Sequence, residues 1–332
     1  MGETVSTDRA WRCHAFGDYH DLEIAPAPAK APDAGEILVR NRAFAVGFPD
    51  MLMVQGLYQL KPPLPFAPCA EFAGEVLAVG TDVTTFAPGD KLMGSMRFGA
   101  AAERLVVAAD NCMHLPAAFD YARGAAFIIA YKTAYVGLVT RGGLRPNETV
   151  LVHGAAGGVG LAAVELAVAL GARVIAMAKG EAKLALARAK GAHAVLDYAD
   201  GGFREQVKAL TDGRGVDVVY DPIGGDVFDE SLHCIAPFGR MLVIGFASGR
   251  IPSVKVNHAL LKQYAVIGVR AGEYGRVYPQ GGREVQAALE QWAASGRLMP
   301  HVHVRLGFGE LLTGFDVIAG RQVMGRVVCE LP

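Results

Sequence analysis

The chain has 332 residues, of which 52% are hydrophobic and 20% are charged, so it can bury a large core and lacks the composition of a disordered protein. Its formal net charge of -1 argues against a general attraction to nucleic acid or to an anionic membrane surface. The first twenty residues lack the apolar core of a secretory signal, and no apolar run reaches the length of about 18 residues that a membrane span needs. The five cysteines are scattered without a CxxC pair, so we expect reduced thiols and a cytoplasmic location.

Residues 1–125 contain short β-like runs, such as EILVRNRAFAV, FAGEVLAVG and AAERLVVAAD, separated by turns rich in proline and glycine. This texture predicts a compact, mostly β domain. From 126 to 268 the chain alternates apolar strand-like runs with helical patterns, and the runs are TVLVHG, RVIAMA, AHAVLDY, VDVVYDP, GRMLVIG and AVIGV. Repeated alternation of strands and helices predicts a parallel sheet with helices on both faces.

Beyond residue 268 we expect a helix around REVQAALEQWAASG, a strand at HVHVRLGF, a helix over 310–319 and a last strand at GRVVCELP. Because the sequence pattern of this segment resembles that of the first 125 residues, we assign 1–125 and 269–332 to one domain. Residues 126–268 are assigned to a second, inserted domain. The predicted fold class is α/β, with a mostly β domain around a doubly wound parallel-sheet domain.

A glycine-rich turn follows the first strand of the inserted domain, with Gly154, Gly157 and Gly160 spaced by three residues. One glycine permits the tight turn, one lets the backbone approach a pyrophosphate, and one lets the next helix, expected over about 159–170, pack close to the strand. The helix then aims its first amides at the phosphates. A glycine triplet alone also fits an ordinary strand-to-helix turn. Here strand, glycines, helix and second strand occur in order, and we assign Gly154, Gly157, Gly158, Val159 and Gly160 to a dinucleotide site.

The end of the second strand, AMAKGEAK, bears on the choice between NADH and NADPH. An NAD site places an acidic residue there to accept from the ribose hydroxyls. This chain has Ala178 and Lys179 instead, and Lys183 follows one helical turn later, so both lysines would attract a 2′-phosphate. Glu181 leaves NAD possible as the cofactor, and the two lysines could instead be solvated residues at a helix start. We predict NADPH.

Other catalytic patterns are missing or incomplete. The sequence has no G-x-S-x-G elbow and no P-loop. Asp217 and Asp221, near the fourth strand of the inserted domain, are interpreted as turn-fixing or dimer-contact residues. His301 and His303 could share one face of a strand, but no third ligand lies near them in the sequence. We therefore expect no metal ion.

The motifs together resemble the medium-chain dehydrogenase/reductase superfamily, and within it the zinc-free, zeta-crystallin-like NADPH:quinone oxidoreductases. In the first domain the resemblance rests on FPDMLMVQGLYQLKPPLPFAPCAEFAGEVLAVG and FAPGDK. In the second it rests on KTAY, RPNETVLVHGAAGGVGLAAVELA, GAHAVLDY, VDVVYDPIGGD and GGREV. The resemblance implies a GroES-like catalytic domain around a Rossmann domain, a cofactor cleft between them, and a homodimer paired through Rossmann sheet edges. The zinc-bearing branch has Gly-His-Glu where this chain reads Cys69, Ala70 and Glu71, and we expect Cys69 to be a small, partly buried residue.

The resemblance also implies roles for individual residues. Tyr58 would face the nicotinamide and donate to the acceptor, unless it is a packing aromatic. The other implied cofactor contacts are Thr133 at the nicotinamide ribose, Lys183 and Tyr198 at the 2′-phosphate, Gly245, Phe246 and Ser248 beside the nicotinamide, and Arg321 near the cofactor. Thr133, Tyr198 and Arg321 have plainer alternatives, which are a helix threonine, a strand-end aromatic and a surface arginine.

The implied function is zinc-independent, NADPH-dependent hydride transfer to a quinone or a similar conjugated carbonyl compound. Many relatives have Asn-Phe-x-Asp where this chain has Gly47, Phe48, Pro49 and Asp50, and the missing side chain at Gly47 opens the pocket to other acceptors. An NADPH-dependent enone or enoyl-thioester reductase is therefore the alternative enzyme. A structural or RNA-binding protein that carries NADPH is the alternative from another class. We interpret Asp50 as a helix-start residue, with proton handling as the alternative, and we expect no nucleic-acid or membrane partner.

Overall fold

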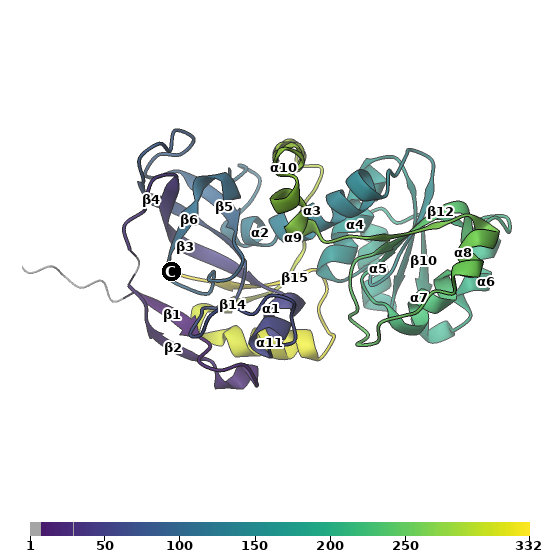
Figure 1. Ribbon diagram of the computed structural model, residues 1–332, viewed down its shortest axis with the longest axis horizontal. Coiled ribbons are helices and arrows are strands. Elements are labelled where there is room, and N and C mark those ends of the chain that lie inside the picture. The colour runs from purple at the N-terminus through teal and green to yellow at the C-terminus, as the bar shows by residue number, and fades with distance from the viewer. Residues whose placement is uncertain (1–7, 29) are drawn as a thin grey trace, which may run out of the picture. The chain divides into compact units, whose positions relative to one another are not determined.

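The computed structural model describes residues 8–28 and 30–332, and the chain forms two compact units (Figure 1). The first unit takes the described residues up to Ile128 together with Met299–Pro332. The second unit is the continuous segment Ile129–Leu298. In the described residues, no helix is both long enough and apolar enough to cross a lipid bilayer.

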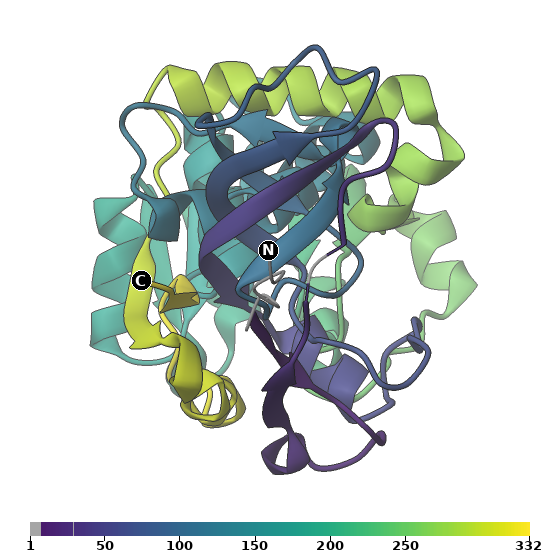
Figure 2. The same ribbon diagram turned by 90° about the vertical axis from the view of Figure 1, so that its left-hand side faces the viewer.

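The first unit is built on a seven-stranded sheet with the order β14-β15-β3-β4-β5-β7, in which β6 also pairs with β3. Strands β14 and β15 are parallel to each other, whereas the other neighbours are antiparallel. The strands of this unit are β1 (Arg9–Arg12), β2 (Glu23–Pro26), β3 (Glu36–Val46), β4 (Glu71–Val79), β5 (Lys91–Ser95), β6 (Arg104–Ala108), β7 (Cys112–His114), β14 (Val302–Gly307) and β15 (Arg326–Glu330). Strands β1 and β2 form a separate antiparallel pair, drawn in dark purple at the lower edge of Figure 2.

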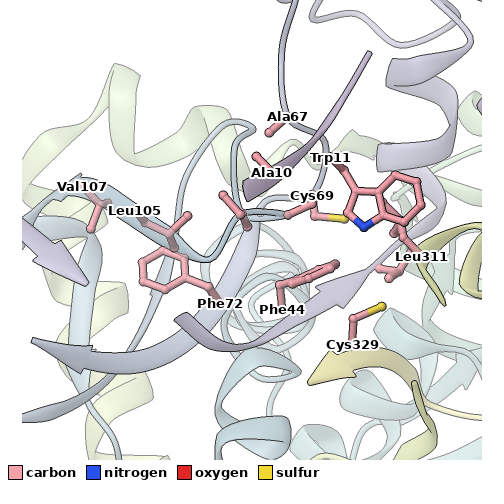
Figure 3. Packing of buried hydrophobic residues seen from close by; sticks show 14 of the residues in the cluster. Ala10, Trp11, Phe44, Ala67, Cys69, Phe72, Leu105, Val107, Leu311 and Cys329 are labelled. Atoms are coloured by element: carbon pink, nitrogen blue, oxygen red, sulfur yellow. The ribbon is translucent and has the colours of Figure 1, made fainter. Parts of the chain in front are cut away.

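Three α-helices belong to the first unit, and they are α1 (Phe48–Val54), α2 (Tyr121–Ala125) and α11 (Leu311–Ala319). The core of the unit gathers large apolar side chains from β3, β4 and β6, including Phe44, Phe72 and Leu105 (Figure 3). Trp11 joins this core, and its indole N–H donates to the Phe308 carbonyl at 2.8 Å, so the buried donor has a partner.

Cys69 lies fully inside this core, so the expectation of partial burial was wrong. The residue precedes β4 in a left-handed backbone conformation, with φ of 66°. We attribute the inward direction of the side chain to that conformation. Burial raises the pKa of the Cys69 thiol well above its ordinary value, so the sulfur stays protonated and packs as an apolar group (Figure 3).

The second unit contains a six-stranded, all-parallel sheet with the order β10-β9-β8-β11-β12-β13. Counted from β8, this is the 3-2-1-4-5-6 order of a doubly wound dinucleotide-binding fold. Its strands are β8 (Thr149–Val152), β9 (Arg173–Ala178), β10 (Ala194–Asp197), β11 (Val216–Asp221), β12 (Ile235–Val243) and β13 (Ala265–Gly268). Its helices are α4 (Gly158–Ala169), α5 (Glu181–Ala189), α6 (Phe203–Leu210), α7 (Gly225–Ser231), α8 (Val256–Lys262), α9 (Ala271–Val277) and α10 (Pro279–Ala294), and α3 (Ile128–Tyr135) enters it from the first unit. All six strands predicted from the apolar runs are confirmed.

Residues 269–298, which we assigned to the first domain, lie in the second compact unit instead. Helix α9 contacts the π-helical segment η3 (Val136–Arg141), and α10 packs closely on α9. The packing is tight because Gly275 and Gly282 face each other, and a Cβ on Gly282 would lie 2.7 Å from the Gly275 Cα. The long yellow-green helix at the top of Figure 2 is α10. Its amphipathic pattern fits either unit, so sequence texture alone does not place it.

Candidate functional site

The glycine turn connects β8 to α4 and has the geometry of a phosphate cradle. Gly154 has φ of 56°, a left-handed conformation in which a side chain is strained. A Cβ on Gly160 would lie 2.2 Å from the Gly154 carbonyl oxygen, so only glycine lets α4 approach this closely. Gly157 caps α4 without a side chain, which leaves the first-turn amides of Gly158 and Val159 for a ligand. These residues fit the pyrophosphate of a dinucleotide.

A buried chain of hydrogen bonds holds this turn from below. The Gly154 N–H donates to the Tyr198 hydroxyl at 2.9 Å, and the same hydroxyl lies 3.1 Å from Nδ1 of the fully buried His153. On the other side of the ring, Nε2 lies 2.7 Å from Ser231 Oγ. The Ser231 hydroxyl itself donates to the Val227 carbonyl at 2.7 Å. Therefore Nε2 carries the imidazole proton and donates to Ser231, while Nδ1 accepts from Tyr198.

Every donor in this series of hydrogen bonds has an acceptor, which is what a buried polar network requires. Burial lowers the pKa of His153 to about 3, so the ring is neutral at physiological pH. Burial also raises the pKa of Tyr198 far above its ordinary value, so the phenol keeps its proton. Sequence reasoning missed His153. Its partners Tyr198 and Ser231 lie 45 and 78 residues further along the chain, and only the adjacent letters VHG hinted at a role.

The predicted 2′-phosphate corner lies where β9 and β10 end. Lys179 is exposed directly after β9, and Lys183 is partly buried in the first turn of α5, where burial lowers the pKa of its ammonium group. A carboxylate also reaches this corner, but it comes from Asp197 on the next strand. Its two oxygens accept the Gly180 N–H at 2.9 Å and the Ala199 N–H at 2.8 Å, and these bonds lower its pKa. Asp197 therefore orders the backbone around the two lysines.

The predicted nicotinamide-side residues Gly245, Phe246 and Ser248 lie in the loop after β12. This loop is fastened to the loop after β11, since the Ser248 N–H donates to the Ile223 carbonyl at 2.9 Å. The two loops follow adjacent strands of the sheet, so these residues and the glycine turn share its carboxyl edge.

The two strand aspartates hold backbone groups, and for Asp221 this is the predicted turn-fixing role. Asp221 is buried at the end of β11 and accepts the N–H groups of Ile223 at 2.8 Å and Gly224 at 3.0 Å, which fixes the turn. Burial raises the pKa of Asp221 to about 6. Asp217 accepts the Thr149 N–H at 2.8 Å and so ties β11 to the start of β8.

Three other predicted site residues occupy ordinary structural positions. The Thr133 hydroxyl donates to the Ile129 carbonyl of its own helix at 2.7 Å. Tyr58 is partly buried and packs against the apolar core of the first unit, just after α1. Arg321 is exposed after α11, with φ of 54°. The cofactor and acceptor contacts of these residues stay predictions.

A buried charged cluster surrounds the start of α1. Gly47 has an extended backbone, with φ of -128°, and its N–H donates to Asp50 Oδ2 at 2.8 Å, which confirms the helix-start role of Asp50. Burial raises the pKa of Asp50 to about 7, although the Gly47 bond and the Arg326 guanidinium both act in the opposite direction. Behind it, the buried carboxylate of Glu71 pairs with Arg326.

Two family models match the chain: "Alcohol dehydrogenase GroES-like domain" over residues 33–117 and "Zinc-binding dehydrogenase" over residues 158–290. Within 8–28 and 30–332, however, no group of three or more His, Cys, Asp or Glu side chains is arranged to hold a metal ion.

Similar proteins are found over nearly the whole length of the chain. It is 37% identical over 311 residues to quinone oxidoreductase-like protein 2 of Bos taurus, covering 93% of this chain and 88% of that protein. It is 35% identical over 318 residues to a quinone oxidoreductase of Pseudomonas aeruginosa, covering 95% and 97%. Among solved structures, a mycobacterial protein complexed with NADPH is similar with a TM-score of 0.89 and 29% identity, over 97% of this chain and 99% of that one.

Proposed function

The chain belongs to the quinone oxidoreductase-like branch of the medium-chain dehydrogenase/reductase superfamily, and from that premise we propose that it reduces a quinone or a similar conjugated carbonyl compound with NADPH. Membership makes it an oxidoreductase with a GroES-like domain and a Rossmann-type dinucleotide-binding domain, as the sequence resemblance implied. Bound NADPH would supply the hydride, and the chain's own residues bind it, orient it and steady the acceptor.

The observation that carries the choice of NADPH is the pair of lysines after β9. A 2′-phosphate gains from nearby ammonium groups and is repelled by a carboxylate. Glu181, the acid that kept NADH open, forms an ion pair with Arg188 at 2.5 Å, and both oxygens of Asp197 accept backbone N–H groups. Lys179 and Lys183 therefore give this corner two ammonium groups. The NADPH bound in the mycobacterial relative supports the same choice.

The direct test compares cofactor affinities. We expect the dissociation constant for NADPH to be more than about tenfold lower than that for NADH, which corresponds to about 1.4 kcal/mol. Lys183→Ala should erase much of this difference, whereas Lys255→Ala, an exposed lysine before α8, should leave it unchanged. Equal affinity of the wild-type protein for both cofactors would refute the proposal.

We assign the residues near the nicotinamide supporting roles. The glycine turn, held by the Tyr198 and His153 network, orients the pyrophosphate, and the loop containing Gly245 and Ser248 borders the nicotinamide. The Tyr58 hydroxyl donates a hydrogen bond to the acceptor oxygen as negative charge develops there. Because one donor in a wet site contributes modestly, Tyr58→Phe should lower turnover by about tenfold, or about 1.4 kcal/mol, and not abolish it.

The position of Gly47 bears on whether the acceptor is a quinone or an enone or enoyl thioester. Gly47 contributes no side chain, and the space that its Cβ would fill is bordered by Asp50 Oδ2 at 3.1 Å and Arg326 Nη1 at 3.7 Å. Gly47 is buried, so this small space alone does not widen an acceptor pocket, and enones and enoyl thioesters stay the alternative acceptors that the sequence suggested. Steady-state rates with NADPH against quinones, enones and enoyl-CoA esters separate the two functions. Complete loss of activity in Tyr58→Phe, with NADPH binding intact, would favour enone reduction, which needs a proton in step with hydride arrival.

We further propose that the protein is a homodimer paired through the β13 edges of two second units. Strand β13 pairs only with β12 in the sheet order, so its outer edge offers backbone groups to a partner strand. Helix α8, which precedes β13 in the chain and contacts β12, buries none of its residues, and Val256, Leu260 and Leu261 are 83%, 76% and 77% exposed. A second copy would cover both features at once. Light scattering should give a dimer, and Leu260→Lys with Leu261→Lys should give a monomer.

A further inference from the structure

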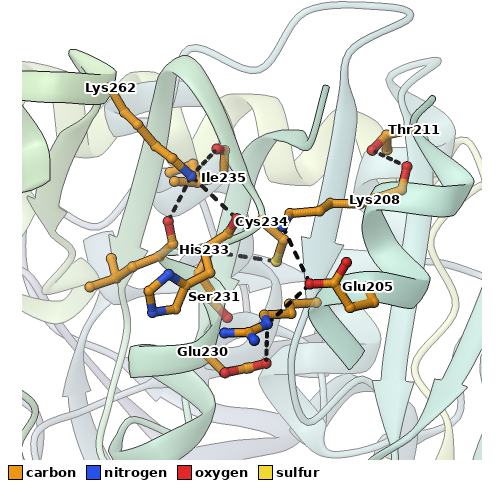
Figure 4. Close-up of polar contacts among 11 residues, drawn as sticks. Glu205, Lys208, Thr211, Glu230, Ser231, His233, Cys234, Ile235 and Lys262 are labelled. Atoms are coloured by element: carbon orange, nitrogen blue, oxygen red, sulfur yellow. Dashed lines mark hydrogen bonds and ion pairs between the residues drawn. The ribbon is translucent and has the colours of Figure 1, made fainter. Parts of the chain in front are cut away.

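The second unit contains a cavity of about 700 Å³ that the proposed function does not use. Figure 4 shows polar contacts among several residues that line it. It lies at the amino ends of β11 and β12, between α6, the turn 211–215, residues 233–237 and the end of α8. The glycine turn and the loop 245–248 follow the carboxyl ends of strands in the same sheet. The cavity therefore lies at the opposite end of the sheet from the dinucleotide site. Its volume is within the range of roughly 300–1,000 Å³ typical of small-molecule sites.

Positive charge dominates the lining of this cavity. Its cationic residues are Arg204, Lys208, Arg214 and Lys262, and Glu205 is its one acidic residue. Glu230 and Asp217, just outside the lining, pair with Arg204 and Arg214, so the excess amounts to about one positive charge, in a chain whose net charge is -1. Converging cations in a concave site raise the local concentration of anions.

Lys262 is the fixed cation of the group. Its ammonium group donates to the carbonyls of Leu232 at 3.0 Å, Ile235 at 3.2 Å and His233 at 3.3 Å, as the dashed lines in Figure 4 show. Within the described chain no carboxylate lies within ion-pair distance of it. Carbonyl dipoles hold the charge in place but do not neutralise it. All three N–H groups of the ammonium are used in this way, so Lys262 presents a fixed positive charge to the cavity and no further hydrogen bond.

The other cations are partly matched by carboxylates and stay adaptable. Lys208 lies 3.4 Å from Glu205, and Arg214 lies 2.5 Å from Asp217. Both are long side chains with solvent-exposed portions, so each can turn toward a ligand at a small cost. The thiol of Cys234 also lines the cavity, and burial raises its pKa to about 12, so it adds no negative charge.

We propose that this cavity binds a small molecule bearing a phosphate group, with Lys262 as a fixed positive charge and with Lys208 and Arg214 as the adaptable residues that donate hydrogen bonds to it. A phosphate carries up to two negative charges and three acceptor oxygens, so several separate cations can share it. The ligand adds to the dinucleotide and does not compete with it, because the two sites lie at opposite ends of the sheet.

Inorganic pyrophosphate is the probe, titrated calorimetrically at constant ionic strength into protein whose dinucleotide site is already saturated with cofactor. We expect one pyrophosphate per chain. Lys262→Gln and Lys208→Gln should each weaken binding about tenfold, while Lys61→Gln, an exposed lysine of the first unit, should leave it unchanged. If Lys262→Gln fails to fold because three carbonyls lose their donor, Lys208→Gln still tests the site, since this half-buried residue of α6 pairs with a side chain, Glu205.

Three outcomes would overturn the proposal. The first is no saturable binding at millimolar pyrophosphate. The second is wild-type affinity in both cavity variants, which would place the anion elsewhere. The third is tighter binding of citrate than of pyrophosphate, which would reject phosphate as the recognised group.

Discussion

Replacing Tyr198 by phenylalanine tests what holds the glycine turn. The resemblance implies that Tyr198 binds the 2′-phosphate, whereas the structure places its hydroxyl 2.9 Å from the Gly154 amide and 3.1 Å from His153 Nδ1. The variant keeps the ring, which lies nearly parallel to the His153 imidazole at a centroid distance of 6.0 Å. Only the two hydrogen bonds are lost, so the experiment isolates them.

The expected cost follows from the groups left behind. The Gly154 N–H loses its acceptor and Nδ1 of His153 loses its donor, both in a buried setting. A buried polar group without a partner costs about 1–3 kcal/mol. We therefore expect Tyr198→Phe to lower the free energy of unfolding by about that amount. We also expect NADPH and NADH affinities to fall by similar factors, since both cofactors use the same cradle.

The measurements are urea unfolding and cofactor titrations, and Tyr220→Phe is the matched control. Tyr220 lies on β11 of the same sheet, and its buried hydroxyl finds no hydrogen-bond partner among residues 8–28 and 30–332. Removing that hydroxyl should leave stability unchanged or raise it. Unchanged stability of Tyr198→Phe, together with a loss of affinity for NADPH alone, would refute the anchoring role and make the tyrosine a 2′-phosphate ligand.

The remaining predictions concern charge, backbone space and metal. Burial raises the pKa of Asp50 to about 7, so the folded state binds this proton more tightly than the unfolded state and stability should fall as pH rises from about 4 to about 7; Asp50→Asn should remove that decline, measured as Tm at a series of pH values. Glu71→Gln should cost about 3–5 kcal/mol in urea unfolding, because it removes the paired counter-charge of Arg326, whose side chain is only 11% exposed, and a loss well below that would contradict the pairing argument. Gly160→Ala should weaken both cofactors at least about tenfold in titrations, because its methyl group would lie 2.2 Å from the Gly154 oxygen and push α4 away. Elemental analysis of protein purified without a metal-binding tag should find far less than one zinc per chain, and stoichiometric zinc whose removal abolishes activity would refute the zinc-free assignment.

The sequence was most informative where structure is local. Buried parallel strands are short apolar runs and glycine turns follow fixed spacings, so the sheet of the second unit and the residues Gly154 to Gly160 could be located without coordinates. Asp50 could be read as a helix-start residue for the same reason, since its partner Gly47 is three residues away.

Features that depend on distant partners could not be predicted. The role of His153 rests on Tyr198 and Ser231, and no local pattern connects the three. The assignment of residues 269–298 failed because the contact between α9 and η3 joins segments more than a hundred residues apart in the chain. Burial of Cys69 depends on a left-handed backbone conformation, which is uncommon for a non-glycine residue and has no sequence signal here.

The pairing of β3 with β15 also constrains the order in which the chain can acquire its structure. Val46 at the end of β3 is in register with Val327, so part of the first unit's sheet cannot close before residues 326–330 have been synthesised. By then the whole of the second unit, which is one continuous segment, has already emerged and can fold on its own contacts. Until β15 arrives, the neighbouring stretch of β3 has open backbone groups beside Phe44, an edge that invites pairing with other chains. The first unit is therefore the part of the nascent protein that depends most on protection from aggregation.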